Sequence, residues 1–343
     1  MAYIVKSSEQ TRSSGAEMET KALLYLMNFR EDSKEIYYYI VDFFNDITGM
    51  DRQAEKLWDV QSKAGKDASP KKIGEELVTL FKNYLSDFEF EEFILFVGGV
   101  SKTVRKDDTL TVFGIDNIQD KARPKIIKGL KEEAEKKIYI DGTSVTDDDI
   151  NEFLTHVKFV IDDKPSSEYV RAILKDSLSL IADDRILNAI FNEIRNTQSN
   201  KKNTKVEGVV IQTKAEALNH FRHIDVKQIR LLTLQRIINK NPIDGSIPRS
   251  FIPIYEKCPP ESQNDLLQDC RIACAHALFN KSSADDFWRL LDSIYKLIIE
   301  NPDADINALY EKLDNDIKNA AEDFDTHSLK YFMAQVKDGI QRC

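Results

Sequence analysis

The feature that most constrains the fold is a pair of almost entirely apolar stretches in the first hundred residues. Residues 35–47 are rich in Tyr, Ile, Val and Phe, and residues 92–97 read Glu-Phe-Ile-Leu-Phe-Val before two glycines. β-Branched and aromatic residues favour strands. Near-continuous apolarity over so few residues is typical of a strand buried on both faces. The two stretches therefore predict a sheet covered by helices.

Helix-like segments flank these strands. Residues 15–29 carry an apolar stripe at helical spacing, and so do residues 70–85, where Pro70 suits a first helical turn. The expected order is helix, strand, strand, helix, strand. Residues 49–56 are expected to form a polar loop between the two strands.

The second of these strands, residues 58–63, carries three polar side chains on one face. Because side chains alternate along a strand, Asp59, Gln61 and Lys63 point the same way, and the other three residues face a core. An amide oxygen and a cation side by side on one strand favour a site that holds a divalent metal next to a lysine.

Carboxylates precede this strand at two places. Asp46 ends the apolar stretch 35–47, and Glu19 belongs to the Gly15-x-x-x-Glu19 opening of the first helix. Mg²⁺ prefers oxygen ligands. Lysine can stabilise charge on a phosphoryl group as a point charge. These residue types together suit phosphodiester hydrolysis.

In order and spacing, Glu19, Asp46 and Gln61-x-Lys63 resemble the PD-(D/E)xK nuclease superfamily, in the variant with Gln in place of the second acid. The opening at Gly15 resembles its Mrr-like branch. The chain looks most like the double-stranded-DNA endonuclease family associated with CD-NTases in bacterial antiphage defence, a broad group that includes the Lamassu nuclease subunit. The resemblance covers about residues 12–100. It implies a restriction-endonuclease-like α/β core, a mixed central sheet flanked by helices.

The resemblance also implies roles for the matched residues. Glu19, Asp46 and Gln61 would bind Mg²⁺ or Mn²⁺, and Lys63 would orient the attacking water and stabilise the phosphoryl oxygens. Several assignments stay open in the sequence. Asp59 is a candidate for a further ligand, Glu17 could replace Glu19, and Asp42 could replace Asp46 because it lies four residues earlier on the same expected strand.

Lys66, Lys71 and Lys72 follow the site directly and are candidates for contacts with DNA phosphates, with a solvated loop as the equal alternative. The whole chain gives no electrostatic argument for nucleic acid, since its net charge is −10. Any DNA contact must use a local basic patch.

No apolar run approaches the ~20 residues that span a bilayer. The start lacks a signal-peptide pattern, and four cysteines in 343 residues do not form a disulfide framework. We therefore expect a cytoplasmic protein.

Beyond residue 163 the pattern is mostly helical, with a polar interruption at residues 199–205 and a short β-prone stretch at 206–211. The expected domains are a nuclease domain at 1–163 and a helical partner-binding or regulatory domain at 164–343.

Together with the site residues, the resemblance implies a metal-dependent endonuclease that cuts double-stranded DNA in antiphage or anti-plasmid defence. We expect it to be restrained by other subunits of a defence complex and activated by self-association into a homo-oligomer. The alternatives are a catalytically degenerate fold that acts as a protein scaffold, and an RNA-cutting or DNA-repair nuclease on the same fold.

Overall fold

The computed structural model describes residues 2–6, 13–140, 145–175, 177, 184–242, 246–280 and 284–340. Contacts between residues divide the chain into two units. Unit 1 comprises Met1–Pro165 and Ile194–Val226, and unit 2 comprises Ser166–Glu193 and Lys227–Cys343. The first division lies beside the expected boundary at residue 163, but a later segment of the chain returns to unit 1.

Unit 1 is built on a mixed seven-stranded sheet with the order β6-β7-β5-β4-β3-β2-β9. Its strands are β2 (Ile36–Val41), β3 (Ile47–Asp51), β4 (Leu57–Lys63), β5 (Glu92–Val97), β6 (Val112–Phe113), β7 (Val157–Ile161) and β9 (His223–Asp225). β4, β5 and β7 are parallel, and the other neighbours are antiparallel. A separate two-stranded sheet pairs β1 (Tyr3–Ile4) with β8 (Val210–Ile211).

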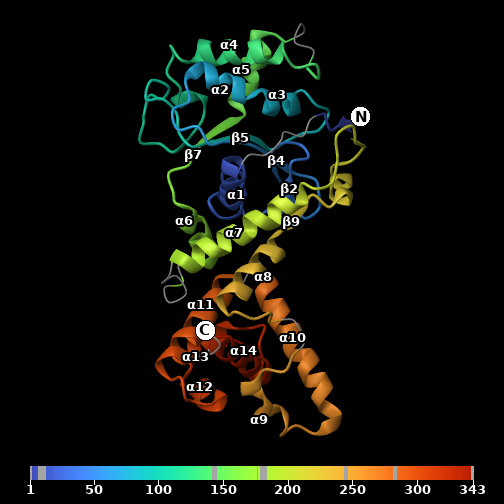
Figure 1. Ribbon diagram of the computed structural model, residues 1–343, viewed down its shortest axis with the longest axis vertical. Coiled ribbons are helices and arrows are strands. Elements are labelled where there is room, and N and C mark those ends of the chain that lie inside the picture. Colours follow the sequence, from blue (N-terminus) through green and yellow to red (C-terminus); the bar gives the residue numbers. More distant parts are fainter. Residues whose placement is uncertain are drawn as a thin grey trace. The chain divides into compact units, whose positions relative to one another are not determined.

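Helices cover both faces of this sheet, as the apolar stretches predicted (Figure 1). One face packs on α1 (Ser13–Asn28), and the other on α2 (Pro70–Glu76), α3 (Val78–Tyr84), α4 (Arg123–Ala134) and α5 (Asp147–Thr155). In β5, Leu95 belongs to the core under α2–α5, whereas Phe96 contacts Tyr25 of α1 at a ring distance of 5.7 Å. This alternation explains why β5 is apolar throughout.

The helices α2 and α4 lie unusually close, and glycines permit the approach. A Cβ at Gly74 would lie 2.0 Å from the carbonyl oxygen of Ile126, and one at Gly129 would lie 2.2 Å from that of Lys71. No side chain fits at either position without moving backbone. The pair therefore holds α2 firmly over the end of β4.

The stretch 35–47 is two strands, not the single strand expected from its apolarity. β2 ends at Val41, the chain reverses over residues 42–46, and β3 begins at Ile47. Asp42 adopts a left-handed backbone conformation with φ of 50°, which allows the tight reversal. Residues up to Asp51, expected in a loop, lie in β3. The reversal is apolar because Phe43 and Phe44 are themselves buried.

Unit 2 is helical. Its helices are α6 (Ser166–Arg171), the first part of α7 (Asp184–Lys201), α8 (Val226–Ile237), α9 (Ile252–Tyr255), α10 (Gln263–Phe279), α11 (Ala284–Glu300), α12 (Ile306–Lys312), α13 (Asn315–Ala320) and α14 (Thr326–Ile340). Short 3₁₀ helices occur at Ile115–Asn117, Ala172–Leu174, Lys214–His220, Arg249–Phe251 and Pro260–Ser262. The interruption expected at 199–205 begins later, because α7 continues to Lys201. Among the described residues, no helix is long and apolar enough to cross a membrane.

Candidate functional site

Asp46 lies at the end of the reversal between β2 and β3, where the register pairs Ile47 with Val60 and so brings Asp46 beside Gln61. Its Oδ2 accepts three hydrogen bonds, from Gln61 Nε2 (2.9 Å), Ser62 N (2.8 Å) and Ser62 Oγ (2.9 Å). Its Oδ1 accepts none from the described residues. One oxygen of this carboxylate is therefore fixed by β4, and the other is left for a different partner.

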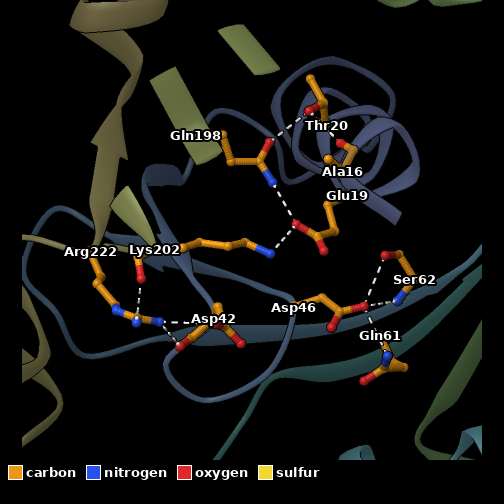
Figure 2. A network of polar contacts seen from close by, with 10 residues as sticks. All are labelled: Ala16, Glu19, Thr20, Asp42, Asp46, Gln61, Ser62, Gln198, Lys202 and Arg222. Atoms are coloured by element: carbon orange, nitrogen blue, oxygen red, sulfur yellow. Dashed lines mark hydrogen bonds and ion pairs between the residues drawn. The ribbon is translucent and has the colours of Figure 1, made fainter. Parts of the chain in front are cut away.

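Glu19 reaches the same region from α1 (Figure 2). Its Oε2 is bonded to Lys202 Nζ at 2.6 Å and accepts a hydrogen bond from Gln198 Nε2 at 3.2 Å. Thr20 Oγ1 donates to Gln198 Oε1 at 2.9 Å, which fixes the amide so that its nitrogen faces Glu19. Within the described part of the chain, Glu19 Oε1 has no hydrogen-bond donor.

The polar row of β4 is covered by helices and is not an exposed face. Thr79 Oγ1 donates to Gln61 Oε1 at 2.5 Å, and Lys63 Nζ lies 3.4 Å from Glu76 Oε2. Asp59 and Gln61 are buried, whereas Lys63 is half-buried. Gln61 consequently offers its amide nitrogen to Asp46 and turns its oxygen toward α3.

The electrostatics of Asp46 follow from this setting. The pKa of the Asp46 carboxyl is raised to about 7, chiefly by burial and also by the neighbouring Glu19 carboxylate, while Lys63 and the Ser62 donors oppose the rise. Because this pKa lies near neutral pH, a cation bound beside the carboxyl would strongly favour its ionised form.

Asp42 does not share a strand face with Asp46. The Arg222 guanidinium nitrogen Nη1 donates to Asp42 Oδ2 at 3.0 Å and to the Asp42 carbonyl at 2.6 Å. Burial raises the pKa of Asp42, and Lys202 and Arg222 counter the effect. Arg222 thus ties the left-handed residue of the reversal to the segment that returns from unit 2.

Asp59 lies in a separate buried cage. Its Oδ1 accepts from Thr48 Oγ1 at 3.0 Å, and its Oδ2 from Asn83 Nδ2 at 2.6 Å and Asn45 Nδ2 at 3.4 Å. Burial raises the pKa of the Asp59 carboxyl to about 6. With both oxygens taken by neutral donors, Asp59 points away from the Asp46 oxygen left open.

The remaining candidates lie away from Asp46. Glu17 Oε1 is 3.7 Å from Lys21 Nζ, and Lys21 in turn pairs with Asp162 at 2.7 Å. Lys71 pairs with Glu132 at 2.7 Å, and Lys72 with Glu76 at 2.9 Å. Lys66 is exposed. The first helix therefore directs Glu19, not Glu17, toward the site.

Whether these groups suit a divalent cation depends on their oxygens. Glu19 and Asp46 each present one carboxylate oxygen to which no described residue donates a hydrogen bond, and Figure 2 shows the two carboxylates facing the same space. Two carboxylate oxygens plus water form a set that Mg²⁺ accepts. The Gln61 oxygen is not part of this set in the structure, and no cluster of three His, Cys, Asp or Glu ligands occurs among the described residues. The residues fit a cation held by two carboxylates.

Sequence reasoning missed the residues that complete the site from far along the chain, Gln198, Lys202 and Arg222. No local pattern marks them, since their partners lie almost two hundred residues earlier. A signal did exist at the end of α2 and in α3. Glu76, Thr79 and Asn83 are polar at helical spacing, and each contacts one member of the β4 row.

The chain was compared with protein-family models, with curated proteins and with solved structures. It matches none of them. Its function is therefore argued from the geometry of Asp46, Glu19 and their neighbours.

Proposed function

We propose that this chain is a metal-dependent nuclease that hydrolyses phosphodiester bonds of double-stranded DNA. The observation that supports it is the pair of open carboxylate oxygens of Glu19 and Asp46, with the Lys63 ammonium close enough to lower the pKa of Asp46. The order of these residues in the chain also resembles PD-(D/E)xK nucleases. A cation bound there would polarise the scissile phosphate and lower the pKa of a bound water.

The chain's own residues have distinct tasks in this proposal. Ser62 and Gln61 fix one oxygen of Asp46 and so orient the other. Lys63 supplies a positive charge next to the developing negative charge of the phosphoryl group. Thr79 fixes the Gln61 amide. Glu76 Oε2 lies 3.4 Å from Lys63 Nζ and helps to fix the position of the ammonium.

One observation favours the alternative, a degenerate nuclease fold that acts as a scaffold. Lys202 already contributes a cation to Glu19 at 2.6 Å, so protein charge balances a carboxylate that a metal would need. In an active enzyme the metal would bind Glu19 Oε1 while Lys202 remains at Oε2, so the two cations would compete for the charge of one carboxylate. The two functions therefore differ in whether Glu19 binds a divalent cation in solution.

We also propose, on the resemblance to defence nucleases, that partner subunits restrain the chain and that self-association activates it. One metal site cuts one strand, and a symmetric homo-oligomer supplies paired sites for a double-strand break. Specific activity that does not change with protein concentration, from a species shown to be monomeric, contradicts this part.

The experiment is cleavage of supercoiled plasmid by the purified full chain with Mg²⁺ or Mn²⁺, alone and at rising protein concentration. Lys63→Ala is expected to reduce the rate by about 10²–10³-fold, because one charge that stabilises the transition state is lost. Lys128→Ala is the matched control, since this lysine is 71% exposed on α4. A Lys63→Ala protein that cuts like the wild type contradicts the nuclease proposal.

Direct measurement of metal binding separates the two functions further. Isothermal titration with Mn²⁺ is expected to show one site that Asp46→Ala abolishes. If the wild type binds no divalent cation and cuts neither DNA nor RNA under any of these conditions, the scaffold function replaces the nuclease.

A further inference from the structure

Three cavities follow one another along unit 1, with Asp46 in the middle one. The first has a volume of about 420 Å³ and the second about 90 Å³, and they share the lining residues Lys82 and Tyr139. The third, about 290 Å³, shares Gln61 with the second and continues past Lys63. Neighbouring cavities share lining side chains and so lie next to one another, and we call this row of three cavities the groove.

The volumes assign different occupants to the first two cavities. The middle cavity, at about 90 Å³, is well below the range of about 300–1,000 Å³ for small-ligand pockets, which suits a phosphate group but not a nucleoside. The first lies within the range of about 300–1,000 Å³ for small-ligand pockets. Its walls include the exposed apolar side chains of Ile4 and Leu85, on which a sugar or base can pack.

Lys82 lies where the first cavity meets the second. Its Nζ donates to the carbonyl of Phe44 at 3.0 Å and lies 5.7 Å from the Tyr3 ring centroid. In contrast to Lys63, Lys71 and Lys72, it is not within 4 Å of a carboxylate of the described residues. Among acids, Asp59 acts on it most strongly and Asp42 next; the Asp59 oxygens are held by Thr48, Asn83 and Asn45, and Asp42 Oδ2 by Arg222. The charge of Lys82 is therefore available to an anion in the groove.

We propose that the first cavity binds the nucleotide next to the scissile phosphodiester, and that Lys82 binds the phosphate that joins this nucleotide to the scissile position. Lys6, in the wall of the same cavity, contributes a second, weaker positive charge; Asp87, also in its wall, opposes both. The proposal rests on the proposed function for the position of the cut, but not for binding itself. It replaces Lys66, Lys71 and Lys72 with Lys82 as the main phosphate contact.

The test is fluorescence anisotropy of a 24-base-pair duplex DNA with the full chain in EDTA, over a series of KCl concentrations. Lys82→Met, which keeps the side-chain length, is expected to weaken binding about tenfold. It should also lower the slope of log K against log salt by about 0.9, the value for one phosphate contact. Lys82→Arg should restore most of the slope. Lys128→Met is the control and should change affinity less than twofold.

A neutral methylphosphonate placed at each position around the mapped cut site locates the contact. At one position adjacent to the cut it should weaken binding to the wild type but not to Lys82→Met. Equal affinity, slope and methylphosphonate response in wild type and Lys82→Met overturn the proposal, whether or not the wild type cuts DNA. Binding that depends on Lys82 without any cleavage supports the nucleotide site and contradicts the nuclease function. If Lys82→Met does not fold, Lys6→Ala gives the second measurement. It should weaken DNA binding about threefold, and an unchanged affinity overturns the proposal.

Discussion

Asp46, in the reversal beside the sheet, and Asp59, in β4, both have a raised pKa, yet their surroundings differ in kind. Asp59 has both oxygens filled by the neutral donors Thr48, Asn45 and Asn83. Asp46 has one oxygen filled by β4 and one left open beside the carboxylate of Glu19. The Asp59 carboxylate thus has its hydrogen bonds within the core, whereas one Asp46 oxygen can still accept a bond from another group.

The difference shows how two carboxylates with raised pKa values can be distinguished. Asp59 has a hydrogen-bond donor at each oxygen, and Asp46 has donors at only one. A carboxylate with a like charge beside it and an oxygen without a donor is unfavourable for the fold alone. Such groups persist where function selects them.

The largest expected effect is a loss of DNA cleavage without a loss of fold stability. Asp46→Ala should lower plasmid cleavage by at least about 10³-fold, because the proposed cation loses one of its two carboxylates. The companion variant Asp46→Asn keeps an oxygen that can accept the hydrogen bonds of Gln61 and Ser62. Its free energy of unfolding in EDTA should stay within about 1 kcal/mol of the wild type or rise, since repulsion from Glu19 is removed. Cleavage assays and urea denaturation measure the two quantities. A large loss of stability would show that Asp46, like Asp59, mainly stabilises the fold.

The reverse pattern is expected at Asp59. Asp59→Ala leaves the donors of Thr48 and Asn83 buried and unsatisfied, which should cost about 2–4 kcal/mol of unfolding free energy. The fraction that stays folded should still bind Mn²⁺ with the wild-type affinity. Asp120→Ala serves as control, because that side chain is 95% exposed. Loss of Mn²⁺ binding in folded Asp59→Ala would make Asp59 a ligand after all.

A smaller, pH-dependent effect is expected at Lys82, which lines the same cavity as Asp46. Burial lowers the pKa of Lys82 from its ordinary value of 10.5 to about 8. The charged form is thus disfavoured in the folded protein, and the resulting loss of stability is full below pH 8 and disappears as pH rises toward 10.5. Lys82→Met should therefore be more stable than the wild type by about 1–2 kcal/mol at pH 7.

Denaturant unfolding at pH 7 and at pH 10 measures this effect. The advantage of Lys82→Met should shrink at the higher pH, where the wild-type ammonium is largely neutral when folded. An advantage that is equal at both pH values, or a less stable variant at pH 7, would mean that the Phe44 and Tyr3 contacts outweigh the cost of burial.

The smallest expected effect concerns Lys202. Because its ammonium and a divalent cation compete for Glu19, Lys202→Met should tighten Mn²⁺ binding by about 3–10-fold, measured by isothermal titration. Lys201→Met, one residue earlier on α7, is the control. Unchanged or weaker Mn²⁺ affinity in Lys202→Met would show that Lys202 orients Glu19 without competing for it.

Local patterns predicted much of unit 1 but not the completion of its site. The alternation in residues 58–63 and the two-sided burial of β5 depend on neighbours in the chain, so sequence periodicity shows them. Asp42 was misplaced because a buried reversal built from Phe43 and Phe44 is as apolar as a strand. The Arg222 and Lys202 contacts depend on chain segments that meet only in the folded state, and no spacing rule reports them.

The segment 194–226 has a consequence for the order of events during protein synthesis. It supplies β9 to the edge of β2, and Arg222 bonds Asp42 across a separation of 180 residues. A nascent chain that ends at Pro165 exposes the edge of β2 and holds Glu19 and Asp42 without their counter-charges. Contacts of such long range form late and slowly. The ribosome must therefore release most of the polypeptide before the candidate site closes, and until then a chaperone has an unpaired strand edge to recognise.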